Sequence, residues 1–192
     1  MSAYPQHQIL EALDEYLAQS PLPEELWVFA YGSLMWNPEM RVVETQQGTV
    51  QGLQRGFNLL STVHRGTIEC PGLVLSLKQG SHCEGLAFRI AGDTKEEDFK
   101  SLWLREMVTL FYRPHLCKVN TATGVVTAIT FVADETHVQF VDYDSATCAN
   151  MIGKAHGGRG SNIDYFNNTF THLKQLKIHD PLFQSIEAHW AD

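Results

Sequence analysis

Leu26-Trp27-Val28-Phe29-Ala30-Tyr31-Gly32-Ser33 contains the longest uninterrupted apolar run of the chain, from Leu26 to Tyr31. A short run with apolar side chains on both faces is typical of a strand that is buried on both sides. Gly32 and Ser33 are turn residues and end the run. Because a membrane-spanning helix needs ~20 apolar residues, we predict an interior strand here and no membrane span.

Further strands are predicted on the C-terminal side of this run. Four short β-prone pieces are separated by Gly and Pro, and their close spacing favours a meandering sheet that closes on itself. The pieces are Thr49–Leu53, Phe57–Leu60, Leu73–Leu77 and Gly85–Ile90. A later hairpin around Thr123-Gly124 would pair Cys117–Asn120 with Val125–Val132.

Helical periodicity surrounds these strands. Apolar residues at helical spacing predict an amphipathic helix over Gln8–Gln19. Thr94 and Glu97 match a capping box, which predicts a helix to about Met107. Two more helices are predicted, one from Asp144 or Ser145 through Ile152 and one after the loop His156–Gly160 with an apolar stripe at Ile163, Phe166, Phe170, Leu173 and Leu176.

This order of elements predicts an α+β fold with a mixed or mostly antiparallel sheet, because a repeating βαβ pattern is missing. No composition shift marks a linker, so we expect one domain over residues 1–192. Residues 1–22 would be an N-terminal helix and linker, and residues 26–192 the catalytic core.

Composition excludes several classes of function. The chain has 192 residues, with 14 Lys and Arg against 22 Asp and Glu, a net charge of −8 that argues against nucleic acid as a partner. The first residues do not resemble a secretory signal, so we expect a cytoplasmic protein. The four cysteines and nine histidines lack metal-site spacing and no nucleotide-binding fingerprint occurs. We therefore expect free thiols, no metal and no cofactor.

The turn Tyr31-Gly32-Ser33-Leu34 is the first candidate functional site. Glycine at a strand end lets the backbone approach a ligand closely, and successive N–H groups in a tight turn can face an anion or a developing oxyanion. The alternative is an ordinary strand terminus.

Glu106 is the second candidate. In the predicted helix it shares a face with Phe99, Leu102 and Trp103, at helical spacing. A carboxylate on an apolar face has its pKa raised by desolvation, which suits a general base near neutral pH. The alternatives are a structural ion pair, for example with Arg105 or Arg113, and a frayed helix end.

The loop His156–Gly160 is a weaker candidate. It precedes a predicted helix, whose N-terminus could hold a phosphate. The alternative is a plain glycine-rich connection.

Several segments together resemble the ChaC-type γ-glutamylcyclotransferases, enzymes that degrade glutathione. The resemblance is carried by residues 27–38, Val63-His64-Arg65-Gly66-Thr67, Pro71-Gly72, Leu102-Trp103-Leu104-Arg105-Glu106-Met107 and Ala155-His156-Gly157. It implies a small closed mixed β-barrel flanked by α-helices. It also implies that Glu106 is the catalytic acid and base and that the γ-glutamyl group is held by Tyr31, Gly32, Ser33, Leu34 and Met35.

Two positions depart from the family pattern. The residue before the loop tyrosine is commonly Gly and is Ala30 here, where a methyl group could narrow the pocket floor or be harmless. The segment Val108–Tyr112 lacks the Gly-Gly of many relatives, and Tyr112 is expected to contact the ligand. We expect Arg65 to bind a substrate carboxylate bidentately, with a structural surface arginine as the alternative.

The resemblance and the residues together favour one reaction. The α-amine of glutathione would attack its own γ-carbonyl carbon, which yields 5-oxoproline and Cys-Gly with no cofactor. The alternatives are a cyclotransferase for other γ-glutamyl-amino acids or amines, a non-catalytic protein that binds a γ-glutamyl metabolite, and a thiol hydrolase that uses one of the four cysteines.

Overall fold

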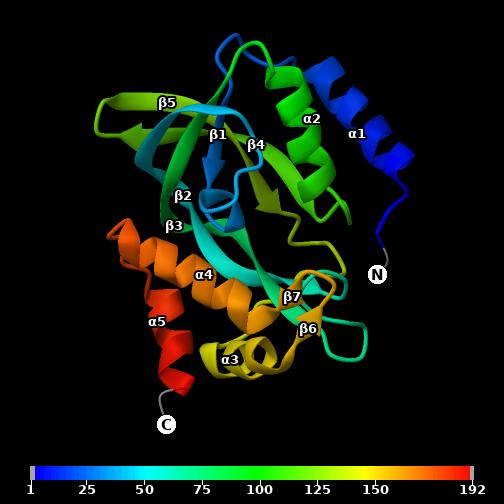
Figure 1. Cartoon of the computed structure of the whole chain (residues 1–192), viewed down its shortest axis with the longest axis vertical. Coiled ribbons are helices and arrows are strands. Elements are labelled where there is room, and N and C mark those ends of the chain that lie inside the picture. The colour runs from blue at the N-terminus through cyan, green and yellow to red at the C-terminus, as the bar shows by residue number, and fades with distance from the viewer. Residues whose placement is uncertain (1–2, 191–192) are drawn as a thin grey trace.

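The centre of the protein is a closed β-barrel, seen in a computed structural model that describes residues 3–190 (Figure 1). The strands follow the order β1-β3-β2-β4-β5 around the barrel. Strand β1 is antiparallel to β3 and parallel to β5, so the barrel is mixed, as predicted. The strands are β1 (Trp27–Ala30), β2 (Val42–Ser61), β3 (Gly72–Ile90), β4 (Tyr112–Thr121) and β5 (Gly124–Ala133).

Strand β1 confirms the prediction for the apolar run. All of its residues are buried, and it is hydrogen-bonded to β3 on one side and meets β5 at Val28 and Ile129 on the other. A strand with neighbours on both edges and packing on both faces exposes no side chain to water, which explains why its sequence does not alternate.

Strands β2 and β3 were predicted as four short strands, and the predicted interruptions within each were wrong. They form two long antiparallel strands that pair from Val42 with Ile90 to Ser61 with Gly72. The register shifts at three places in β2, and Gly52 has a φ of +82° beside one of them. Bulges of this kind let a strand bend around a barrel without leaving the sheet, so Gly marks a bend here and not an end.

The helices form two groups (Figure 1). Helices α1 (Gln6–Gln19) and α2 (Lys95–Glu106) lie together along one side of the barrel, where Trp103 Nε1 donates to the carbonyl of Ile9 at 2.9 Å. The second group lies at the end of the molecule near the C-terminus. It consists of α3 (Ser145–Lys154), α4 (Asn162–Gln175), α5 (Pro181–Glu187) and the 3-10 turn η2 (Ala188–Trp190).

Local capping agrees only in part with the sequence prediction. Helix α2 begins after Thr94 as expected, but the capping box is not formed because the Thr94 hydroxyl donates to the Asp98 carboxylate at 2.7 Å. At α3 the prediction is confirmed, since the Asp144 carboxylate accepts from the Thr147 N–H at 2.8 Å. Helix α5 and η2 were not predicted.

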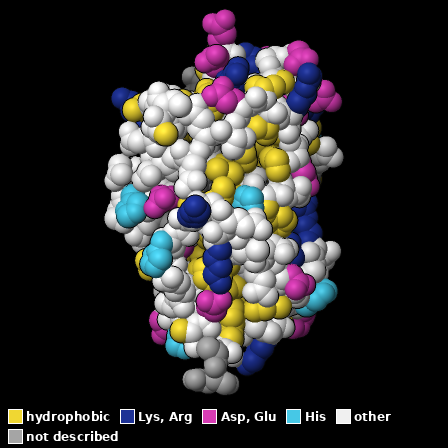
Figure 2. Space-filling model, turned by 60° about the vertical axis from the view of Figure 1, so that its left-hand side comes forward, with side chains coloured by type: hydrophobic (Ala, Val, Ile, Leu, Met, Phe, Trp, Pro, Cys, Tyr) yellow, Lys and Arg dark blue, Asp and Glu magenta, His cyan; other side chains and the backbone are white. Residues whose placement is uncertain are grey.

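Charge is unevenly distributed over the surface. Figure 2 shows several acidic side chains gathered at one end of the molecule, with Lys and Arg side chains among them. This is the end where α2 begins, and Glu96, Glu97 and Asp98 lie in its first turn, where they complement the helix dipole. Within residues 3–190, none of the helices combines the length and apolar character needed to cross a membrane.

Candidate active site

The loop after β1 carries free hydrogen-bond donors. The chain leaves the strand at Tyr31 and forms a 3-10 turn, η1 (Ser33–Met35), in which the Met35 N–H donates to the carbonyl of Gly32 at 3.0 Å. Within the described part of the chain, the N–H groups of Ser33 and Leu34 donate to no backbone or side-chain acceptor. Unsatisfied N–H groups at a helix start are available to an anion or to a developing oxyanion.

The residues that carry these donors line a small pocket, which shares part of its wall with a larger cavity. The pocket has a volume of about 30 Å³ and the cavity about 360 Å³. Both are lined by Ser33, Val74, Glu106, Tyr112 and Tyr165. The pocket is also lined by Tyr31, Gly32 and Leu34, whereas Met35 is buried in the core at 4% exposure. The structure therefore brings the predicted loop and Glu106 to one space.

Glu106 is the last residue of α2, and its side chain is 16% exposed. Burial raises the pKa of this carboxyl, the charges of Arg105 and Arg159 oppose the increase, and Glu39 adds to it. Its Oε1 lies 3.3 Å from Arg105 Nε, so the predicted alternative of an ion pair is also present. The pair leaves the carboxylate on the cavity wall, while Arg113 pairs with Asp134.

Arg105 joins the end of α2 to the loop after β1. Its guanidinium donates to Ser33 Oγ at 3.0 Å and to the carbonyl of Asn37 at 2.6 Å, and it lies 3.1 Å from Glu39 Oε2. Through these contacts Arg105 fixes the position of the Glu106 carboxylate relative to Ser33. From the sequence, Arg105 was expected only as an alternative ion-pair partner of Glu106, and its place next to Glu106 in the chain is the signal that points to a wider role.

Three buried tyrosines surround the pocket. Tyr31 donates its hydroxyl to the carbonyl of Phe131 at 2.9 Å, and Tyr112 donates to the carbonyl of Leu75 at 2.8 Å. Tyr165, which sequence reasoning missed, accepts from the Leu75 N–H at 3.3 Å, and within residues 3–190 its hydroxyl hydrogen has no acceptor. Burial raises the pKa of Tyr165, so the hydroxyl stays protonated and can donate into the pocket.

Arg65 also lines the cavity, and it is held on two sides. Its N–H donates to Ser61 Oγ at 2.9 Å and its guanidinium donates to the carbonyl of Ser161 at 3.2 Å. The guanidinium carbon lies 5.3 Å from the centre of the Tyr165 ring, within cation–π range. A preoriented arginine thus lies in the wall of the cavity that Glu106 also lines.

The loop His156–Gly160 forms a small hairpin of β6 (His156–Gly157) and β7 (Gly160–Ser161). It packs on the Val63–Gly66 loop so closely that a Cβ on Gly157 would lie 2.5 Å from the Gly66 nitrogen. The following helix N-terminus is capped by Ser161 Oγ, which accepts from Asp164 N–H at 3.1 Å. His156 is exposed, and the loop instead contributes Arg159 to the cavity wall.

Both departures from the family pattern can be placed. Ala30 is fully buried in β1, where it pairs with Leu86, and its methyl group lies outside the cavity lining. Val108 and Thr109 line the cavity, and Leu110 has a φ of +53°, a left-handed conformation that glycine adopts more easily. The chain therefore makes the turn without Gly-Gly.

The cysteines are poorly placed for catalysis. Burial raises the pKa of Cys83 to about 11, of Cys117 to about 12 and of Cys148 to about 11, while Cys70 is exposed on the surface. The lining of both cavities contains no cysteine among the described residues. Residues 3–190 likewise contain no group of three or more His, Cys, Asp or Glu side chains that could hold a metal ion.

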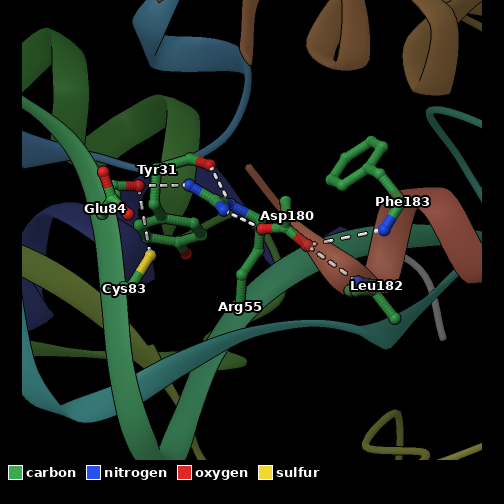
Figure 3. A network of polar contacts seen from close by, with 7 residues as sticks. All are labelled: Tyr31, Arg55, Cys83, Glu84, Asp180, Leu182 and Phe183. Carbon is green, nitrogen blue, oxygen red and sulfur yellow. Dashed lines mark hydrogen bonds and ion pairs between the residues drawn. The ribbon is translucent and has the colours of Figure 1, made fainter. Parts of the chain in front are cut away.

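A buried ion pair supports the loop from behind (Figure 3). Arg55 in β2 pairs with Asp180, donates through Nε to the carbonyl of Tyr31 at 2.7 Å and through Nη2 to the carbonyl of Glu84 at 2.5 Å. Asp180 Oδ1 accepts from the N–H groups of Leu182 and Phe183 and caps α5. The network ties α5 to the start of the site loop, and no local pattern of residues indicates it in advance.

Comparison with solved structures identifies the class of this fold. The chain superposes on the crystal structure of a selenomethionine-labelled γ-glutamyl cyclotransferase specific to glutathione from yeast, with a TM-score of 0.77 and 21% identity, over 86% of this chain and 96% of that chain. The barrel and its helices are thus a γ-glutamylcyclotransferase fold.

Sequence comparison gives the family. Residues 26–190 match the model of the ChaC-like protein family, and the chain belongs to that family. It is 37% identical to the glutathione-specific gamma-glutamylcyclotransferase of Escherichia coli K12. The match extends over 166 residues and covers 85% of this chain and 72% of that relative. It is 31% identical over 171 residues to glutathione-specific gamma-glutamylcyclotransferase 1 of Danio rerio, over 85% of this chain and 87% of the relative.

Proposed function

We propose that this protein is a glutathione-specific γ-glutamylcyclotransferase, which cleaves glutathione to 5-oxoproline and Cys-Gly. The observation that carries the proposal is the meeting of the Glu106 carboxylate and the free N–H groups of Ser33 and Leu34 at one small pocket. The family and the names of the relatives agree with this activity.

The mechanism needs one proton carrier and one oxyanion site. Glu106 takes a proton from the α-ammonium group of the substrate, and the amine attacks the γ-carbonyl carbon to close a five-membered ring. The carbonyl oxygen becomes an oxyanion that the N–H groups of Ser33 and Leu34 stabilise. Glu106 then gives its proton to the cysteine nitrogen, and the C–N bond breaks. The second proton of the ring nitrogen passes through Glu106 to the released amine, so that 5-oxoproline and Cys-Gly in its ammonium form leave. Because the attack is intramolecular, no enzyme nucleophile is required.

The other predicted site residues have binding roles in this proposal. The loop that holds the γ-glutamyl group consists of Tyr31, Gly32, Ser33, Leu34 and Met35, and the last of these, at the end of η1, anchors the loop in the core. Tyr112, which lines the same pocket, contacts the same group. Arg65 binds the α-carboxylate, and its hold on Ser161 and Tyr165 orients the guanidinium for this contact.

Incubation of the purified protein with reduced glutathione tests the proposal. We expect 5-oxoproline and Cys-Gly in equal amounts, and faster turnover of glutathione than of γ-glutamyl-alanine. Preference for γ-glutamyl-alanine would indicate a cyclotransferase of broader substrate range. Binding of γ-glutamyl compounds without any 5-oxoproline would overturn the enzymatic proposal in favour of a metabolite-binding protein.

We also propose a cytoplasmic location for the reaction. All four cysteines are free thiols. Unpaired cysteines are typical of proteins in a reducing compartment. Such a compartment also keeps glutathione in the thiol form that the proposed reaction consumes.

Arg65→Ala is expected to raise KM about tenfold or more with a smaller change in kcat, because a charged hydrogen bond to a ground-state carboxylate contributes ~1.5–3 kcal/mol. Initial-rate kinetics with glutathione measure both constants. An unchanged kcat/KM would show that Arg65 does not bind the substrate and that its role is limited to its structural contacts with Ser161 and Tyr165.

The Tyr165 hydroxyl lines the pocket, and we expect it to be a third donor to the oxyanion beside the N–H groups of Ser33 and Leu34. Tyr165→Phe is therefore expected to lower kcat by about 100-fold, since removal of one oxyanion-site donor typically costs ~3 kcal/mol. The substitution leaves the Leu75 N–H without its acceptor and slightly lowers stability as well. Kinetics below the unfolding temperature separate the two effects. An unchanged kcat in a folded variant would restrict the role of Tyr165 to packing under Arg65.

A further inference from the structure

Arg159 lies at the rim of the cavity on the turn between β6 and β7. Its backbone is fixed, because Arg159 N–H donates to the carbonyl of His64 at 2.9 Å and Gly158 N–H donates to the carbonyl of Val63 at 2.8 Å. Gly160 follows with a φ of +100°, which lets the chain reverse. The turn thus holds an exposed arginine beside the cavity, whose wall it helps to form.

The three arginines of the cavity differ in how they are engaged. Arg105 pairs with the carboxylates of Glu39 and Glu106 and donates to two further oxygens. Arg65 donates to the carbonyl of Ser161 and lies over the Tyr165 ring. Within residues 3–190 the guanidinium of Arg159 has no hydrogen bond, ion pair or aromatic partner. Arg159 is therefore the arginine of this cavity whose donors are all available to a ligand.

The charge of Arg159 lies close to titratable groups that line the same cavity, among them Glu39 and His64. A hydrogen bond from Asn37 lowers the pKa of Glu39, and the charges of Arg105 and Arg159 contribute to the lowering. Burial lowers the pKa of His64, with Arg159 as the largest charge contribution. The carboxylates of Glu39 and Glu106, which face this rim, are already paired with Arg105.

The proposed substrate has a group that matches this free cation. A γ-glutamyl tripeptide carries two carboxylates, one beside the reacting amine and one at its C-terminal end. With Arg65 assigned to the first, the second lies about two residues beyond the reacting carbonyl, roughly 7 Å away in an extended chain. The Arg159 guanidinium at the rim has N–H donors that are unpaired among the described residues and can bind a carboxylate bidentately, so it can bind the carboxylate at the C-terminal end of the peptide.

We propose that Arg159 binds the C-terminal carboxylate of the γ-glutamyl peptide, and that this contact makes the protein select peptides ending in a free carboxylate. The inference rests on the proposed function, because it takes the reacting end of the peptide to lie at Glu106. It adds a specificity-determining residue on the β6–β7 turn, remote from the loop that holds the γ-glutamyl group.

The test compares glutathione with its C-terminal amide, which has the same shape and lacks that negative charge. We expect the wild-type protein to show a roughly tenfold higher kcat/KM for glutathione, as one charged hydrogen-bonded contact would give. In Arg159→Gln this ratio falls to about one, because only the glutathione value drops. Arg159→Lys retains part of the ratio. Lys118→Gln, which removes an exposed positive charge outside the cavity lining, leaves it unchanged.

Binding separates this inference from the proposed reaction. Calorimetry of glutathione and its amide with Glu106→Gln, alone and combined with Arg159→Gln, measures the contact without turnover. If adding Arg159→Gln removes the preference for glutathione over its amide, the role of Arg159 is supported. This holds even if the wild-type protein forms no 5-oxoproline, because that second result would overturn only the proposed reaction. An equal loss for both ligands, or no loss for either, would overturn the role of Arg159.

Discussion

Glu106→Gln is expected to lower kcat for glutathione by about 10³-fold or more, within the range that general acid–base catalysis supplies. Glutamine has nearly the same shape, but it can neither take the proton of the α-ammonium nor return it to the leaving nitrogen. The N–H groups of Ser33 and Leu34 remain in place, so binding of glutathione is retained. Discontinuous assay of 5-oxoproline measures the loss of turnover, and calorimetry measures binding.

Glu187→Gln is a matched control, since Glu187 is half exposed and pairs with Lys174 on the surface. We expect it to leave kcat unchanged. Turnover of Glu106→Gln within a few-fold of the wild type would remove Glu106 from the mechanism. The remaining activity would then have to come from the oxyanion site and substrate folding alone.

The pH dependence of kcat/KM is an independent test of the role of the Glu106 carboxylate. Burial raises the pKa of Glu106 above its usual 4.5, and the base must be ionised in the free enzyme. The acid limb of kcat/KM is therefore expected at a higher pH than an exposed glutamate would give. Because the folded state holds this proton more tightly than the unfolded chain, Glu106 contributes stability at low pH that is lost as pH rises through its raised pKa. Glu106→Gln is accordingly at least as stable as the wild type at neutral pH.

The central parts of the site could be predicted because their signals are local. The apolar run that ends in Gly32 marks a buried strand followed by a turn, and the structure places that turn on the pocket. The spacing of Glu106 from Phe99 and Trp103 put its carboxylate on the inner face of a helix. Both inferences use only periodicity and turn chemistry over about a dozen residues, where sequence is most informative.

The parts that escaped prediction depend on contacts between distant segments. Arg105 reaches Ser33, Tyr165 accepts from Leu75, and each pair is separated by more than seventy positions. Isolated residues of these types occur on every surface, so their roles follow only from the barrel closure. The β2 bulge at Gly52 escaped for another reason, since glycine in a strand and glycine in a turn look alike in one sequence.

Asp180→Ala is expected to lower the free energy of unfolding by about 3–5 kcal/mol, the cost of leaving one member of a buried ion pair without its partner. The Arg55 side chain is 3% exposed and that of Asp180 is 10% exposed, so water cannot replace the lost carboxylate. Helix α5 also loses its N-cap. For a chain of this size the loss corresponds to a decrease in Tm of roughly 6–20 °C, measurable by calorimetry.

Lys174→Ala provides the comparison, because the Lys174–Glu187 pair is about half exposed and such pairs contribute ~1 kcal/mol or less. A Tm for Asp180→Ala equal to that of Lys174→Ala would contradict the assigned burial. The double variant Arg55→Met/Asp180→Leu replaces both charges with apolar groups and is expected to recover most of the stability. It still lacks the Arg55 contact to the carbonyl of Tyr31. We therefore expect the double variant to be stable but to have a lowered kcat. This result would separate the role of Arg55 in supporting the oxyanion loop from the contribution of the ion pair to stability.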